Sequence, residues 1–213
     1  MKQYLLGVDS GTTGVKAKLY DLEGNVQAES YIAYDCVYLK PGWVEQSVEI
    51  LTESLYDCIC MTVKKAAAKG ISKEEIISIG FSTQRNTHMY MDKNGNILRN
   101  GMAISWQDGR STKQERWMKT FEEKYFSISG LPVSTAFASC KIKWVMENEP
   151  EVFEKQTKFF LHKNTFCMNL EHKMDGFKIG LMRRNLDLWI SIQWKSVQNY
   201  VPYGELIVQN FQK

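Results

Sequence analysis

The chain contains 213 residues, which is enough for one large or two small domains. Hydrophobic residues make up 44% of it and charged residues 24%, ordinary values that exclude a disordered tail, a collagen-like fibre and a coiled coil. The net charge is +3, from 27 basic and 24 acidic side chains, and it gives no electrostatic reason to expect nucleic acid or a membrane surface as a partner.

The cysteines are scattered and lack the spacing of a metal or redox site. They are Cys36, Cys58, Cys60, Cys140 and Cys167. One residue separates Cys58 from Cys60, whereas zinc and redox pairs have two, and no histidine cluster accompanies them. We therefore expect free structural thiols in a reducing compartment. The apolar run before Asp9 is too short for a signal peptide, and no later run approaches the ~20 residues of a membrane span, so the cytoplasm is the expected location.

Three short strands joined by tight turns are expected at the start of the chain. An apolar run predicts a strand at 4–8, alternation of apolar and polar residues predicts a second at 15–20, and a third follows at 26–33. The connections are too short for a parallel crossover, so the three strands should form an antiparallel meander. A Rossmann fold is excluded, because it would place a helix directly after the first glycine loop.

A long helix and a mixed region are expected next. Ser47 is a typical helix N-cap, apolar residues recur at helical spacing after it, and Gly70 supplies the stop. The later elements are a strand at 76–81, a hairpin around the turn 92–96, a short strand at 103–106, and helices that continue to about residue 154 with an interruption at 130–132. No internal repeat or linker is evident.

The loop after the first strand has the composition of a phosphate site. A carboxylate, two glycines and two threonine hydroxyls lie between Asp9 and Gly14. Glycines let the backbone approach a phosphate closely, and amides and hydroxyls donate hydrogen bonds to its oxygens. Asp9 could hold magnesium through water, and Lys16 could add positive charge, although strand alternation could also direct it to solvent. The loop lacks the Gly-Lys-Ser/Thr ending of a Walker A motif, and an ordinary hairpin turn is the alternative.

Several segments carry motifs that occur together, and in this order, in one family. They are 7–13, 40–46 (Lys-Pro-Gly-Trp-Val-Glu-Gln), 80–87, 103–110 (Trp-x-Asp-x-Arg within it), 129–132, 141–144 and 149–150. This order resembles the N-terminal domain of the FGGY carbohydrate kinases, the group that contains glycerol kinases and xylulokinases. The resemblance covers residues 4 to about 166 and implies an α/β fold of the actin-like, ribonuclease-H-like type, with a mixed sheet flanked by helices.

The resemblance also implies a reaction, the transfer of the γ-phosphoryl group of MgATP to a hydroxyl of a sugar or polyol. Phosphoryl transfer depends mainly on positioning and on neutralising charge. By this resemblance Asp9 is the catalytic and Mg²⁺-handling carboxylate, with the metal held through water. The same resemblance assigns the transferring phosphate of ATP to Gly11, Thr12, Thr13 and Lys16.

The substrate positions also follow from the resemblance. They are Gln84, Arg85, Trp106 and Asp108, which would hold hydroxyls or form an aromatic wall. Core packing is the alternative for Trp106, and Arg110 is expected to pair with a carboxylate in a structural role.

Two departures from the glycerol kinases bear on the substrate. Those proteins carry glutamate where this chain has Asn86, and tyrosine where it has Ala136. Both changes remove polar groups that hold a small polyol, so glycerol is disfavoured. The segment from Trp106 to Arg110 is closer to xylulokinases, which however have Met-His in place of Gln84-Arg85. The expected substrate is a pentose, a pentulose or a polyol.

The expected organisation is a sugar-binding domain at 1–166 followed by a divergent or truncated tail at 167–213. The family's general base lies in a Gly-x-x-Asp segment for which this chain has no match, and a second domain holds the adenine. We therefore expect part of a kinase, inactive alone and completed by a C-terminal kinase domain on a separate chain; a homodimer is left open. The alternative is a non-catalytic sugar- or phosphate-binding module. An actin- or chaperone-type protein does not account for 41–43 and 106–110.

Overall fold

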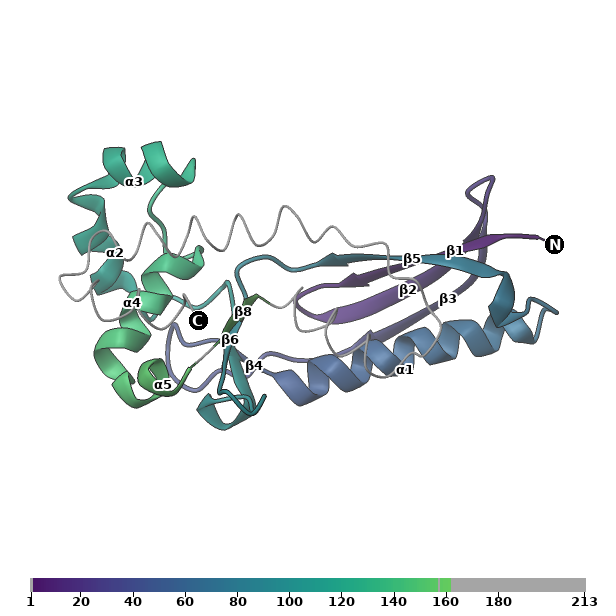
Figure 1. The fold of residues 1–213 in the computed structure, drawn as a ribbon, viewed down its shortest axis with the longest axis horizontal. Coiled ribbons are helices and arrows are strands. Elements are labelled where there is room, and N and C mark those ends of the chain that lie inside the picture. The colour runs from purple at the N-terminus through teal and green to yellow at the C-terminus, as the bar shows by residue number, and fades with distance from the viewer. Residues whose placement is uncertain (1, 157, 162–213) are drawn as a thin grey trace. The chain divides into compact units, whose positions relative to one another are not determined.

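A computed structural model of the chain describes residues 2–156 and 158–161 (Figure 1). The chain divides into two compact units. Among the described residues, the first contains 2–105, 155–156 and 158–161, and the second contains Trp106–Glu154. The predicted tail at 167–213 lies outside the described residues.

The sheet of the first unit contains the predicted meander. Strands β1 (Tyr4–Ser10), β2 (Gly14–Asp21) and β3 (Val26–Ala33) pair antiparallel, and β5 (Ile76–Thr83) adds to β1 in parallel. The strand order is β3-β2-β1-β5. Strands β1 and β5 each continue two residues beyond the predicted ends, because the backbone of Asp9 and Ser10 pairs with neighbours on both sides.

One face of this sheet is buried under helix α1 (Val48–Ala67), which runs along the strands in Figure 1. The side chain of Ser47 accepts a hydrogen bond from the N–H of Ile50, so Ser47 is the predicted N-cap. Alternation along the strands sends one set of side chains into this core. The sheet and the helix both contribute side chains to this core. They include Leu6, Val8, Val15, Ala17 and Leu19 from the sheet and Leu51, Leu55, Cys58 and Ile59 from the helix.

A second, smaller sheet completes the first unit. Its order is β4-β7-β6-β8, formed by Glu45–Ser47, Met102–Ile104, His88–Met91 and Lys158–Leu161. Two 3₁₀ turns, η1 (Lys73–Glu75) and η2 (Arg99–Gly101), lie in the connections. The predicted hairpin around 92–96 is confirmed by the bridge between Met91 and Ile97 and by the N–H of Leu98, which bonds to the carbonyl of Tyr90.

The second unit is helical over its described residues. It contains α2 (Thr112–Lys119), α3 (Glu122–Ser129) and α4 (Ala138–Asn148), and α5 (Pro150–Lys155) follows. The predicted interruption is Gly130, whose φ of 67° ends α3 in the left-handed region that glycine tolerates. Its small core is formed by Met118, Tyr125, Val133 and Cys140.

Two expectations about absent features concern the described part only. Among the described residues, no disulfide joins Cys36, Cys58, Cys60 or Cys140. Within residues 2–156 and 158–161, none of the helices has the length and apolar character needed to cross a membrane.

Candidate functional site

The predicted phosphate loop connects β1 to β2 as a tight hairpin. The N–H of Gly11 donates to the carbonyl of Gly14 over 2.9 Å, which closes the loop. Gly14 is required by space, because a Cβ there would lie 2.7 Å from the carbonyl oxygen of Ile32 and against the ring of Tyr31. This close approach explains the second glycine of the motif.

Three consecutive carbonyls of the loop accept hydrogen bonds from side chains. The donors are Tyr34 Oη to Gly11 O (2.8 Å), Gln46 Nε2 to Thr12 O (2.9 Å), and Tyr31 Oη to Thr13 O (3.2 Å). In a trans peptide the N–H points opposite to the preceding carbonyl. Each of the amides of Thr12, Thr13 and Gly14 is therefore directed away from the side chain that holds the carbonyl of the same peptide group. Successive backbone amides in such a loop can form a concavity that binds anions.

Tyr34 keeps its proton under all ordinary conditions. Burial raises the pKa of the Tyr34 phenol to about 12. The hydroxyl therefore remains a hydrogen-bond donor to the carbonyl of Gly11 across the physiological range.

Asp9 lies in a row of polar side chains across the sheet, next to this loop. In the register it is beside Lys16 on β2 and Ser82 on β5, and Lys16 is beside Tyr31 on β3. Directly opposed residues share a face of the sheet, and all four are exposed, so the row lies on the face that α1 does not cover. Lys16 is thus exposed, as alternation indicated, but on the same face as the Asp9 carboxylate.

Gln84 lies beside the same loop. Its backbone N–H donates to the carbonyl of Ser10 over 2.8 Å, and its side-chain Nε2 donates to Gln46 Oε1 over 2.8 Å. Arg85, the next residue, is exposed. The first unit therefore brings together Asp9, the loop and Gln84. The sequence does not predict the role of Gln46: the segment 40–46 carries a family motif, but nothing in it indicates two distant partners for this side chain.

The second unit contains the other two predicted substrate residues. Arg110 holds the carboxylate of Asp108 by Nε to Oδ1 (2.9 Å), Nη2 to Oδ2 (2.8 Å) and its own N–H to Oδ1 (3.0 Å). Both side chains are fully buried, and the expected carboxylate partner of Arg110 is thereby confirmed. These three hydrogen bonds fix the position of the Asp108 carboxylate. Trp106 is 39% exposed, so core packing does not describe it.

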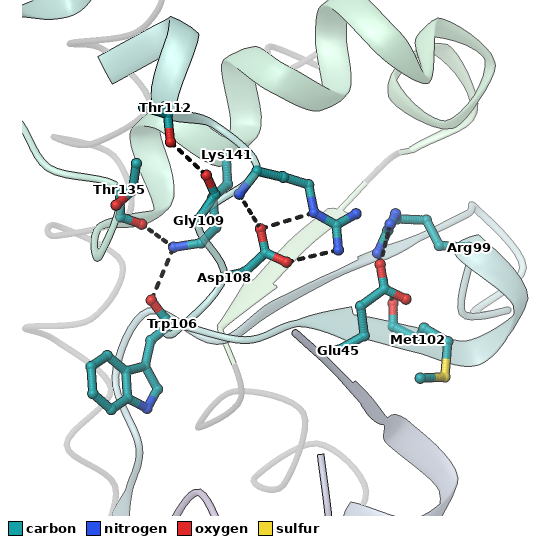
Figure 2. Close-up of polar contacts among 10 residues, drawn as sticks. Glu45, Arg99, Met102, Trp106, Asp108, Gly109, Thr112, Thr135 and Lys141 are labelled. Atoms are coloured by element: carbon teal, nitrogen blue, oxygen red, sulfur yellow. Dashed lines mark hydrogen bonds and ion pairs between the residues drawn. The ribbon is translucent and has the colours of Figure 1, made fainter. Parts of the chain in front are cut away.

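Lys141 is a buried lysine that sequence reasoning missed. It is fully buried, and Figure 2 shows its Nζ donating to the backbone carbonyls of Trp106 and Thr135. Lys141 thereby joins the segment that carries Trp106 to the one that precedes Ala136. Burial lowers the pKa of Lys141 to about 8, although the nearby Asp108 carboxylate opposes that shift.

The acidic residues limit what metal chemistry the chain offers. Within the described ranges, no group of three or more His, Cys, Asp and Glu side chains could enclose a metal ion. Asp9 is an exposed, single carboxylate. Such a ligand fits Mg²⁺, which keeps several waters and is often held by one or two carboxylates together with substrate phosphates.

The close packing at Gly14 leads to a test of the loop. We expect Gly14→Ala to lower the free energy of unfolding by about 1–3 kcal/mol, because the Ile32 backbone carbonyl in the way of the new methyl group cannot rotate aside. Gly80→Ala, in the same sheet, is the control: its Cβ would meet nothing within 4 Å, and we expect a change within about 0.5 kcal/mol. Urea unfolding measures both, and equal effects at the two positions would contradict the packing argument.

Comparison with known proteins gives one family match. The model of the N-terminal domain of the FGGY family of carbohydrate kinases matches residues 4–179. A glycerol kinase of Desulforamulus reducens is 35% identical over 181 residues, which are 84% of this chain and 35% of that protein. A glycerol kinase of Halothermothrix orenii is 32% identical over 84% of this chain and 35% of its own length. The chain thus spans about a third of the curated relatives that it matches.

Solved structures agree on the fold. A xylulose kinase from Lactobacillus acidophilus superposes with a TM-score of 0.71 at 22% identity, over 78% of this chain and 33% of that one. A Plasmodium falciparum glycerol kinase with ADP gives a TM-score of 0.69 at 24% identity, over 79% and 34%. The mixed sheet and helices described above are therefore the fold of these N-terminal domains.

Proposed function

Because the chain belongs to the FGGY family of carbohydrate kinases, of which it contains the N-terminal domain, we propose that it forms the sugar-binding part of an ATP-dependent kinase. The reaction is transfer of the γ-phosphoryl group to a hydroxyl of a pentose, a pentulose or a polyol. The observation that carries this proposal is the loop from Gly11 to Gly14, in which side chains hold three consecutive carbonyls beside the exposed Asp9 carboxylate.

The residues of the first unit suit the phosphate end of the reaction. The amides of Thr12, Thr13 and Gly14 donate to phosphate oxygens, and Lys16 adds a positive charge on the same face. Asp9 holds Mg²⁺ through its water shell. When bound, the metal neutralises negative charge on the phosphate oxygens. Gln84 and Arg85 meet substrate hydroxyls beside this loop.

The second unit contributes Trp106 and Asp108 in this proposal. The exposed indole of Trp106 offers an apolar face to the carbon skeleton of a sugar. The carboxylate of Asp108 accepts a hydrogen bond from one substrate hydroxyl. Lys141 donates a hydrogen bond to the backbone carbonyl of Trp106, and Arg110 forms an ion pair with Asp108, so both substrate residues are held in position.

The substrate class follows from Asn86 and Ala136. At Asn86 an amide stands where glycerol kinases carry a carboxylate, and charged acceptors bind hydroxyls more strongly than neutral ones. Ala136 leaves space that a tyrosine would fill. The similar proteins include both glycerol kinases and a xylulose kinase, so their names do not decide between the two substrate classes. We favour the larger polyhydroxy substrates.

A separate C-terminal kinase domain is the proposed partner. It supplies the general base and the adenine site, and without it the chain is slow or inactive. Loss of a general base alone typically removes ~10²–10⁴ of the rate.

Calorimetry tests the substrate and the partner together. Xylitol, D-xylulose, glycerol and related compounds are titrated into the chain with and without MgATP. Binding of a five-carbon compound more tightly than glycerol supports the proposal. Binding of sugar with no phosphate transfer, even when a C-terminal kinase domain is added, supports the non-catalytic binding module instead.

Asp9→Asn tests the metal role. We expect Mg²⁺-dependent ATP binding to weaken at least ~10-fold and any phosphate transfer to stop, because an amide replaces the charge that holds the metal. The fold should be unaffected, since Asp9 is exposed. Asp57→Asn, at an exposed position of α1, is the matched control. Undiminished Mg²⁺-dependent binding in Asp9→Asn would remove Asp9 from the mechanism.

A further inference from the structure

A chain of two side-chain hydrogen bonds joins the proposed substrate residue Gln84 to the phosphate loop. Gln84 Nε2 donates to Gln46 Oε1 over 2.8 Å, and Gln46 Nε2 donates to the carbonyl of Thr12 over 2.9 Å. Gln46 is 1% exposed, so water does not compete for these bonds. Its side chain therefore contacts both Gln84, a proposed substrate residue, and Thr12 of the phosphate loop.

The donor and acceptor roles in these two hydrogen bonds are fixed by the Thr12 carbonyl. A carbonyl oxygen only accepts, so Gln46 must turn its NH₂ group toward Thr12. Its own oxygen then faces Gln84 and requires a donor there. Gln84 must therefore use its NH₂ group on Gln46, which leaves its Oε1 atom as the remaining polar group.

This Oε1 atom is a buried hydrogen-bond acceptor. Gln84 Oε1 is shielded from solvent and has no hydrogen-bond partner among residues 2–156 and 158–161. A buried acceptor without a donor costs free energy, which a ligand that supplies a donor recovers. A hydroxyl group can donate a hydrogen bond to this oxygen. A carbonyl or carboxylate oxygen would repel it, because neither can donate.

We propose that Gln46 is a positioning residue, which fixes Gln84 as an acceptor for a substrate hydroxyl and links that contact to the backbone of the phosphate loop. Gln46 itself touches neither substrate nor nucleotide. The inference rests on the proposed function, because it takes the ligand of Gln84 to be a polyhydroxy compound. It adds a requirement to that function: the substrate presents a hydroxyl at this position, not a keto or carboxylate oxygen.

The test uses the ¹⁵N-labelled chain, xylitol as the probe, and NMR titration, which measures weak affinities. The backbone amide of Thr13 reports on the Thr12 carbonyl, since both belong to one peptide group. We expect xylitol to shift this amide in the wild-type chain. Gln46→Met should weaken xylitol binding ~10-fold and abolish the shift. Gln3→Met, at an exposed position, is the control and should behave as the wild type.

A second variant, Gln84→Met, gives a test that needs no ligand and does not depend on whether Gln46→Met folds. Without xylitol, Gln84→Met should move the Thr13 amide resonance, because loss of one donor changes the bond that Gln46 makes to Thr12. An unmoved Thr13 resonance, or wild-type affinity in a folded Gln46→Met variant, overturns the inference. A wild-type chain that binds no polyol overturns the proposed function and with it the substrate half of the inference, while the ligand-free Thr13 result still decides the link to the loop.

Discussion

Glu45→Gln is expected to lower the free energy of unfolding of the first unit by about 3–5 kcal/mol, the usual cost of leaving one charge of a buried ion pair without its partner. Arg99 Nη2 lies 2.6 Å from Glu45 Oε1, and the two side chains are only 7% and 4% exposed (Figure 2). Arg99 also has a φ of 58°, in the left-handed region that is strained for arginine. The ion pair therefore holds a backbone conformation that the local sequence does not favour.

Urea unfolding of the variant measures this effect. Glu53→Gln, at an exposed position of α1, makes the same chemical change and should alter stability by no more than about 0.5 kcal/mol. The double variant Glu45→Leu with Arg99→Met should recover most of the loss, because apolar side chains of similar size tolerate burial. A loss below about 1 kcal/mol in Glu45→Gln would show that the pair contributes little.

Stability of the second unit is expected to rise as the pH increases from 8 to 9, which is the opposite of the usual behaviour of a stabilising lysine. Burial lowers the pKa of Lys141 from its ordinary value of 10.5 to about 8. Between these values the unfolded chain binds the proton and the folded chain releases it, so unfolding is disfavoured as the pH rises. The expected gain is about 1 kcal/mol between pH 8 and 9, and up to about 3 kcal/mol over the whole window.

The neighbouring Cys140 limits this rise. Burial raises the pKa of its thiol from 9.0 to about 11, so the folded chain keeps a proton that the unfolded chain loses. Above pH 9 that difference lowers stability and offsets the effect of Lys141. Cys140→Ala should therefore extend the rise toward pH 10.5.

Urea unfolding at several pH values, followed by tryptophan fluorescence, measures the profile. Lys141→Met should remove the rise between pH 8 and 9, because no titrating ammonium remains at the site. Lys113→Met, at an exposed position of α2, should retain it. A rise of the same size in Lys141→Met would assign the effect to another group.

Polar residues differ widely in how far the sequence predicts their contacts. The pairing of Arg110 with a carboxylate could be predicted, because its partner Asp108 is two positions away and the geometry is local. The roles of Lys141 and Gln46 could not. Lys141 lies on a helix where lysine is ordinarily solvated, and only packing shows that it is buried. Gln46 acts on Thr12 and Gln84, which are 34 and 38 positions away.

The meander, the long helix, the hairpin and the family can all be predicted from the sequence, since alternation, caps, turn residues and motif order are properties of neighbouring residues. Which polar groups are buried, and which of them meet, depends on tertiary packing. Only the folded structure aligns Asp9 with Lys16 and Ser82, holds the carbonyls of the phosphate loop, and leaves the buried Gln84 Oε1 without a donor among residues 2–156 and 158–161. The reason is physical: hydrogen-bond partners and burial depend on distance in space, and the chain brings these residues together only when the sheet has formed.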